Sequence, residues 1–138
     1  MSTNAIWALQ KAIQAALEAD LALGAYLGSP ARLYDDVPPQ PQFPFATWDS
    51  ARLVPVRADH AGALEHRLTL KIWSRYGGRR ESLEILQAVR AVLDDAPLVL
   101  DGHKLVSLST IFADVFRIRS SHIFEAILTV RAVTEPIP

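Results

Sequence analysis

Residues 64–74 read LEHRLTLKIWS, and apolar and polar side chains alternate along this run. The first set of alternate positions carries Leu64, His66, Leu68, Leu70 and Ile72. The second set carries Glu65, Arg67, Thr69 and Lys71. Because successive side chains of a β-strand point to opposite faces, this pattern predicts a strand with one face against a core and the other toward solvent. Gly77 and Gly78 interrupt the alternation and end the predicted strand.

Helices are predicted before and after this strand in the sequence. Asn4 can cap a helix whose apolar residues recur at three- and four-residue steps. These apolar residues are Ile6, Leu9, Ile13 and Leu17. Asp20 can open a short second helical segment, which Gly28 then stops. A further helix is predicted for residues 80–94, with an apolar face made of Ile85, Leu86, Val89, Val92 and Leu93.

Two more β-prone runs lie before residue 64. Residues 32–34 predict a short strand, and residues 45–57 predict a longer one in which Pro55 requires an edge position or a bulge. The four prolines between them fix φ and supply no N–H, so residues 35–44 are expected to form an extended loop. Another loop is expected near residues 59–62.

The last third of the chain predicts an antiparallel meander. Asp101-Gly102 favours a two-residue hairpin turn, with strand residues before it at 99–100 and after it from Leu105. Residues 107–116 and 122–134 predict two longer strands around a polar turn at 117–121.

The order of these elements predicts the fold class. We expect an α+β fold with a single layer of mostly antiparallel sheet, covered on one face by two main helices. The other face would be half-apolar and available for contacts. No repeat, low-complexity tract or boundary divides the chain, so residues 1–138 are expected to form a single domain.

Composition excludes several classes of protein. Half of the residues are hydrophobic and 21% are charged, which is typical of globular domains rather than disordered chains. A formal net charge of -1 gives no overall attraction to nucleic acid or to an anionic membrane. The N-terminal residues lack the basic start and apolar run of a signal peptide, and no stretch is long enough to span a bilayer. The sequence therefore predicts neither secretion nor membrane insertion.

The sequence offers little for acid–base or metal chemistry. The four histidines, His60, His66, His103 and His122, are too far apart for a short metal-binding spacing. The chain has no cysteine, which excludes disulfides and thiolate sites and fits a reducing compartment. We therefore expect no catalytic residue, metal site or cofactor. An enzyme would need a pocket assembled from distant residues such as His66, His122 and Glu125.

Paired charges and glycines have structural interpretations as well as functional ones. Asp94-Asp95 follows a predicted helix, which favours a helix-exit turn or an interface contact. Gly77-Gly78-Arg79-Arg80 resembles neither a Walker loop nor a dinucleotide fingerprint. It is interpreted as a strand-to-helix turn with solvated arginines, or as a partner-binding loop.

Arginine, proline and tryptophan indicate the candidate protein–protein contacts. Eleven of the fourteen cations are arginine, which forms bidentate pairs with carboxylates at interfaces. Trp73 falls on the polar face of the predicted strand, so it is the apolar residue best placed to be exposed in an isolated subunit. The candidate subunit or tube interface consists of Asp35, Asp36, Pro38, Pro39, Trp73, Arg75, Arg79 and Arg80. The alternative is that the loop at 35–44 and the turn at 76–80 are only connectors.

The collinear order of short motifs resembles a known family. The motifs are Arg32-Leu33-Tyr34-Asp35-Asp36-Val37-Pro38-Pro39, Phe43-Pro44-Phe45, Glu65-His66-Arg67-Leu68-Thr69-Leu70, Ile72-Trp73-Ser74, Gly77-Gly78, the helix 84–93, Asp95-Ala96-Pro97-Leu98 and Arg131-Ala132-Val133-Thr134-Glu135-Pro136. Together they cover nearly the whole chain, and none of them is a catalytic signature. In this order they resemble the tail-completion or tail terminator proteins of tailed phages and gene transfer agents.

This resemblance implies a structural role. It implies a subunit that forms a homo-oligomeric ring, a hexamer, on the head-proximal end of the tail tube, ends tube polymerisation and provides the head-attachment surface. The implied partners are other copies of the chain, the tail tube protein and the head–tail connector protein, with DNA passing through the lumen without specific binding. The implied location is the cytoplasm of the producing cell during assembly, and then the particle tail. A different tail tube or head–tail connector subunit is the nearest alternative, and a small-molecule enzyme is a more distant one.

Overall fold

The computed structural model describes residues 4–56, 62–118 and 121–137. Its helices are α1 (Ala5–Ala19), α2 (Leu21–Leu27) and α3 (Arg80–Leu93). Its strands are β1 (Leu33–Tyr34), β2 (Phe45–Pro55), β3 (Leu64–Ser74), β4 (His103–Arg117) and β5 (Phe124–Pro136). His60, the centre of the loop predicted near residues 59–62 and the middle of the turn predicted at 117–121 lie outside the described residues.

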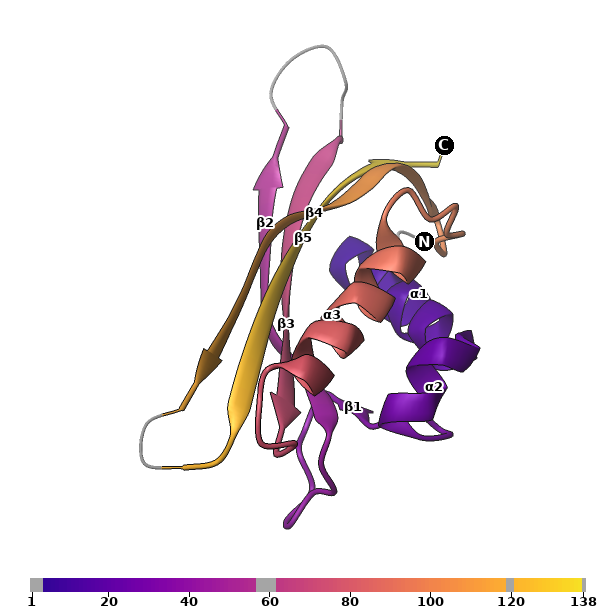
Figure 1. Ribbon diagram of the computed structural model, residues 1–138. Coiled ribbons are helices and arrows are strands. Elements are labelled where there is room, and N and C mark those ends of the chain that lie inside the picture. The colour runs from indigo at the N-terminus through magenta and orange to yellow at the C-terminus, as the bar shows by residue number, and fades with distance from the viewer. Residues whose placement is uncertain (1–3, 57–61, 119–120, 138) are drawn as a thin grey trace.

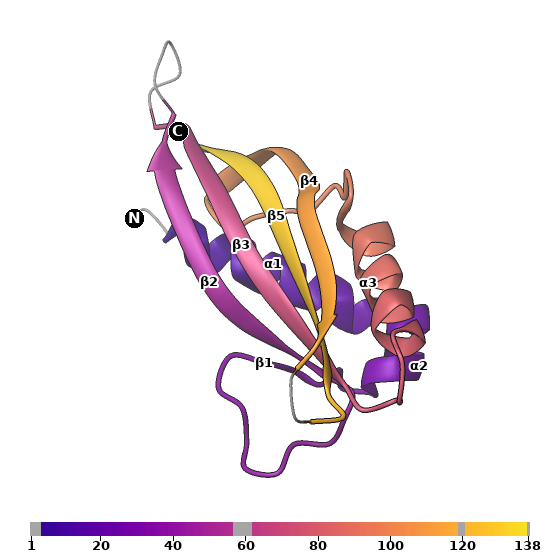
Figure 2. The same cartoon turned by 60° about the vertical axis from the view of Figure 1, so that its left-hand side comes forward.

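The strands form one sheet in the order β1-β2-β3-β5-β4. Neighbouring strands are antiparallel except for β1 and β2, which are parallel and pair at only two positions. All three helices lie on the same side of this sheet in both views (Figures 1 and 2). The predicted α+β class, with two main helices on one face of a mostly antiparallel sheet, is confirmed.

The core lies between the helices and the sheet, and it follows the predicted periodicities. On β3, Leu68, Leu70 and Ile72 face the helices and are at most 2% exposed. Ile13 on α1 and Ile85 on α3 are fully buried against them. Burial of each such side chain contributes about 1.5–3 kcal/mol, so this shared core holds the helices to the sheet.

Short polar side chains cap the first turns of α1 and α2. The Asn4 side chain accepts a hydrogen bond from the Trp7 amide at 3.1 Å and caps α1, as predicted. Asp20 follows the end of α1 and its carboxylate accepts from the Leu23 amide at 2.9 Å, so it caps α2. Gly28 then ends α2 with φ 85°, a conformation that glycine adopts without strain.

The prediction for residues 99–116 is partly wrong. Asp101-Gly102 does form a tight turn, but the strand expected before it is reduced to one isolated bridge between Leu100 and His103. The two runs expected after the turn are one continuous strand, β4. Two bulges in β4 shift its register against β5 and let it follow β5 along its whole length.

Candidate interaction surfaces

The two segments selected from the sequence, residues 35–44 and 76–80, lie at the same end of the sheet (lower end of Figure 1). Arg75, which directly precedes the second segment, links them, because its guanidinium lies 4.1 Å from the centre of the Phe43 ring. Cation–π contacts of this kind hold an arginine over an aromatic face while leaving its N–H groups available. The structure therefore brings the proline loop and the β3–α3 turn into one surface, which we call the loop-end surface.

A cluster of aromatic side chains packs against the loop-end surface. Phe43 meets Phe45 edge to face at 4.9 Å, and Phe45 stacks on Trp73 at 6.1 Å. The Trp73 indole N–H donates to the Thr47 hydroxyl at 3.2 Å. The ring is consequently half-buried. The prediction that Trp73 would be the exposed apolar residue is wrong, because β2 places Phe45 opposite it and Thr47 within hydrogen-bonding distance of its indole N–H.

Arg75 and the two arginines of the turn, Arg79 and Arg80, have different environments. All are exposed, and Arg79 lies over the Phe124 ring at 5.8 Å. Arg80 donates to the Glu84 carboxylate at 2.7 Å, and the same carboxylate accepts from the Tyr26 hydroxyl. The hydrogen bonds from Tyr26 and then from Arg80 lower the pKa of Glu84. Arg80 is therefore tied to α2 and α3, whereas Arg79 is tied to β5.

The acidic and proline residues of the loop are accessible. The four predicted residues of this segment are all exposed, namely Asp35, Asp36, Pro38 and Pro39. The Asp35 carboxylate accepts from the Gln10 side-chain amide of α1 at 3.3 Å. This bond connects the loop to a second feature, which lies between α1 and β1.

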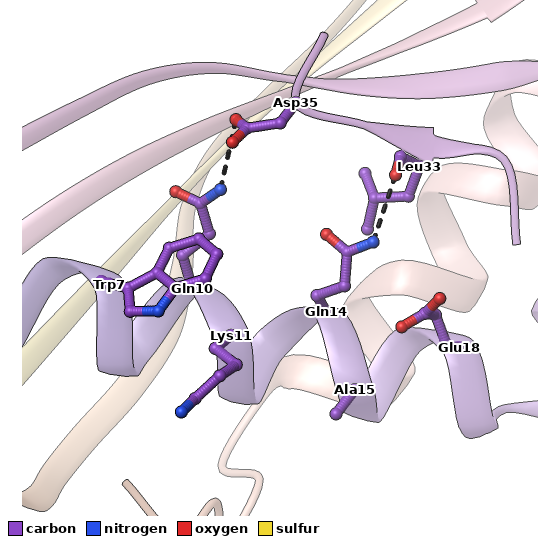
Figure 3. Close-up of a pocket in the computed structure, with 8 residues that line it drawn as sticks. All are labelled: Trp7, Gln10, Lys11, Gln14, Ala15, Glu18, Leu33 and Asp35. Carbon is purple, nitrogen blue, oxygen red and sulfur yellow. Dashed lines mark hydrogen bonds between the residues drawn. The ribbon is translucent and has the colours of Figure 1, made fainter. Parts of the chain in front are cut away.

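That feature is a groove of about 340 Å³, which the sequence interpretation missed (Figure 3). We call it the α1 groove. It is lined by Trp7, Gln10, Lys11, Gln14, Ala15, Glu18, Leu33 and Asp35. Trp7 is 52% exposed, whereas Trp48 and Trp73 are half-buried. Trp7 lies seven and eleven residues before Gln14 and Glu18, which puts a lone aromatic ring on the polar face of α1. This sequence feature could have revealed the α1 groove.

The face of the sheet away from the helices is charged. Arg67 on β3 lies in register with Arg52 on β2 and with Arg131 on β5. Glu65 accepts from Arg131 at 2.7 Å and from Arg67 at 3.3 Å, and its hydrogen bond with Arg131 lowers the pKa of Glu65. Strand register places Trp73, Ile127 and Val133 on the same face, so this face carries apolar as well as charged side chains.

The residues suggested for an enzymatic pocket do not converge. His66 is fully buried on the helix-facing side of the sheet, while Glu125 lies on the opposite side beside Lys71 at 3.3 Å. His122 is exposed in the turn before β5. Within residues 4–56, 62–118 and 121–137, no group of three His, Asp or Glu side chains is arranged to hold a metal ion. In the same ranges no helix combines the length and apolarity needed to cross a bilayer.

Comparisons with known proteins agree on the class of protein. The family model described as tail completion protein gp17 matches residues 11–135. Eighteen chains of solved structures match the fold, and no curated protein matches the sequence. One of these chains belongs to a structure titled "Virion of native gene transfer agent (GTA) particle". It is 27% identical, has a TM-score of 0.85, and the match covers 96% of this chain and 99% of that chain. The chain therefore belongs to the tail completion protein gp17 family, a family of structural tail proteins.

Proposed function

We propose that the protein is a tail terminator, which assembles as a hexameric ring on the head-proximal end of a finished tail tube. The ring stops further addition of tube subunits and presents the surface to which the head attaches. The observation that carries this proposal is the match along 96% of the chain to a subunit of a gene transfer agent virion.

The distribution of exposed surfaces supports a ring. A closed ring of identical subunits needs a head-to-tail contact, in which two different patches of each subunit meet around the axis. The subunit has unlike exposed regions: the loop-end surface, with arginine and proline residues, and the α1 groove, with Trp7 at its rim. The face of the sheet away from the helices is a third exposed region, which remains for the tube or the head.

The partners follow from this role. They are other copies of the chain, the tail tube protein and the head–tail connector protein. DNA passes through the lumen without specific binding, because smooth transit requires that no strong phosphate contact holds it. Assembly takes place in the cytoplasm of the producing cell, and the ring then stays in the particle tail.

Purified protein mixed with purified tail tubes tests the proposal. Negative-stain imaging should show a ring at one end of each tube, and tubes capped in this way should not lengthen when tube subunits are added. Tubes that lengthen by incorporating this protein would instead identify a tube subunit. Binding to isolated head connectors, with no effect on tube growth, would identify a connector subunit.

A further inference from the structure

We propose that the outer face of the sheet, the face away from the helices, binds a carboxylate side chain of another tail protein between Arg52 and Arg67. The inference rests on the function proposed above, in which this face remains for the tube or the head, and it adds the chemistry by which a partner is recognised there. The site is a hollow of about 390 Å³, which we call the arginine hollow. It is lined by Ser50, Ala51, Arg52, Arg67, Thr69 and Thr129.

Three arginines cross the outer face in one row. Arg52 on β2 lies opposite Arg67 on β3, and Arg67 lies opposite Arg131 on β5. Like charges that are directly opposed on neighbouring strands destabilise a sheet, so each of these pairs needs a carboxylate to offset the repulsion. A local conflict of this kind, kept on an exposed face, is typical of a site with a function.

The pair formed by Arg67 and Arg131 has its carboxylate within the chain. One oxygen of Glu65 accepts from Arg131 at 2.7 Å, and the other accepts from Arg67 at 3.3 Å. Within residues 4–56, 62–118 and 121–137, no carboxylate pairs with Arg52. The residue opposite Glu65 on β2 is Val54, which has no charge. Glu65 therefore shows how a carboxylate bridges two arginines of this row, and the pair formed by Arg52 and Arg67 lacks such a bridge.

Hydroxyl groups line the arginine hollow on the side of the row away from Glu65. Ser50 lies opposite Thr69, and Thr69 lies opposite Thr129, so a row of hydroxyls runs beside the row of arginines. The Thr69 and Thr129 hydroxyls share one hydrogen bond at 3.2 Å, which leaves one of their two hydrogens to donate elsewhere. A carboxylate in the hollow would accept from the guanidinium groups and from this hydroxyl. Charge-assisted bonds of this kind are the strong ones at protein surfaces.

The arginine hollow is open to a partner. Ser50 and Arg52 are exposed, and the Arg67 side chain is 50% exposed. β1 pairs with β2 only at Ala46 and Thr47, so in the described part of the chain no strand covers the edge of β2 beside Arg52. A partner side chain can therefore reach the two arginines without any movement of the sheet.

The balance of charge on the outer face favours a carboxylate over the phosphate backbone of DNA. Among the described residues, the cations of this face are Arg52, Arg67, Lys71, Lys104 and Arg131, and its carboxylates are Asp49, Glu65, Asp114, Glu125 and Glu135. The two sets are equal in number, so the face as a whole does not attract a polyanion. Lys71 holds Asp49 at 3.6 Å and Glu125 at 3.3 Å, so neither of these acids serves Arg52. The unmet demand is for one carboxylate at one place.

Binding of a labelled acidic peptide to the purified protein tests the site. Fluorescence anisotropy at low salt, with fluorescein-labelled hexaglutamate as the probe, should show saturable binding. Arg52→Gln should weaken this binding about tenfold, because it removes one of the two charged donors. The variant should stay folded by circular dichroism, since the side chain is exposed.

Arg117→Gln is the matched control. It removes an exposed arginine from β4, outside the arginine hollow, and changes the net charge by the same amount. Its affinity for hexaglutamate should stay close to that of the wild type. Equal losses in the two variants would mean that the probe responds only to overall charge, and would overturn the site.

A variant that fills the arginine hollow provides a second measurement. Ser50→Glu places a carboxylate of the chain itself beside Arg52 and Arg67. It should weaken hexaglutamate binding far more than Arg117→Gln does, and it should raise the thermal unfolding midpoint by relieving the repulsion between the two arginines. Ser50→Gln, which has the same length and no charge, should do neither. Wild-type affinity for hexaglutamate in Ser50→Glu would contradict the proposal.

Two comparisons distinguish the possible occupants. Heptathymidylate carries as many negative charges as hexaglutamate but presents phosphates, so it should bind more weakly and without dependence on Arg52. Tighter binding that is lost in Arg52→Gln would overturn the choice of a carboxylate in favour of DNA. Rings that form with the unmodified chain and fail to form with Arg52→Gln would place the carboxylate on a second copy, and would overturn the choice of another tail protein.

The site and the proposed function can fail separately. Absence of hexaglutamate binding by protein that still caps tail tubes would overturn the site and leave the terminator function intact. Failure of the unmodified protein to cap tubes, with normal hexaglutamate binding, would instead overturn the terminator function and leave the carboxylate chemistry of the hollow.

Discussion

At the scale of single residues, His66 shows how the fold determines the chemistry of a side chain. Its imidazole is fully buried on the core face of β3, and its Nε2 lies 2.8 Å from the Thr134 hydroxyl. Burial, and to a smaller extent the charge of His103, lowers the pKa of His66. The neutral imidazole is therefore a polar member of the core, linked to β5.

This burial predicts that the protein loses stability in acid. The unfolded chain binds a proton at His66 below about pH 6.5, whereas the folded protein binds it only at lower pH. The free energy of unfolding should therefore decrease as the pH falls from about 6.5 toward the folded pKa. Thermal unfolding followed by circular dichroism at several pH values measures this decrease.

His66→Gln is the matched variant, because glutamine can keep a hydrogen bond to Thr134 and does not titrate. It should flatten the part of the pH dependence that lies below about pH 6.5. An identical pH profile in both proteins would assign the acid sensitivity to other groups.

At the scale of secondary-structure elements, α1 and α2 begin at local caps that are visible in the sequence. Asp20 ends α1 with a bond from its backbone N–H and caps α2 with its side chain, so one residue forms the corner between the two helices. The Gly77-Gly78 pair likewise separates β3 from α3, and Gly77 has φ 92°. These positions were predicted correctly because a cap or a turn depends on a few neighbouring residues.

Removing the Asp20 cap should destabilise the protein moderately. Asp20→Ala leaves the Leu23 amide without its partner, which costs about 1 kcal/mol. In a chain of this size the unfolding midpoint should fall by roughly 4 °C. Asp20→Asn keeps an acceptor oxygen and should stay close to wild type. Equal losses in both variants would mean that the charge, and not the cap, stabilises this corner.

The turn between β3 and α3 gives a prediction about assembly. Arg79→Ala with Arg80→Ala should leave the subunit folded, because both side chains are exposed. If the turn contacts a neighbour or the tube, capping of tail tubes should require about tenfold more protein, since interfacial arginines often dominate binding. Lys replacements at both positions keep the charge and test whether the planar guanidinium is required. Normal capping by the alanine variant would make the turn a simple connector.

At the scale of the whole molecule, one layer of helices covers one face of one sheet, and all three helices contribute to a single core. The strongest test of this arrangement lies on β5, between β3 and β4. Leu128→Ala removes a fully buried side chain and should lower the free energy of unfolding by about 3 kcal/mol. Thr129→Ala, on the opposite face of the same strand, should cost about 1 kcal/mol or less. Chemical denaturation of both variants measures the difference, and equal losses would contradict the assignment of the two faces.

The sequence by itself determined the helices, most strand bounds, the helix-facing side of β3 and the class of protein. Each of these depends on a periodicity, a cap or an ordered set of motifs along the chain. Tertiary structure alone decided that Trp73 is half-buried and Trp7 is open, because Phe45 and Thr47 reach Trp73 only through strand pairing. It also decided that β4 is one bulged strand and that α1 and β1 enclose a groove. The physical reason is that exposure and concavity depend on neighbours that are distant in sequence, which a local pattern does not contain.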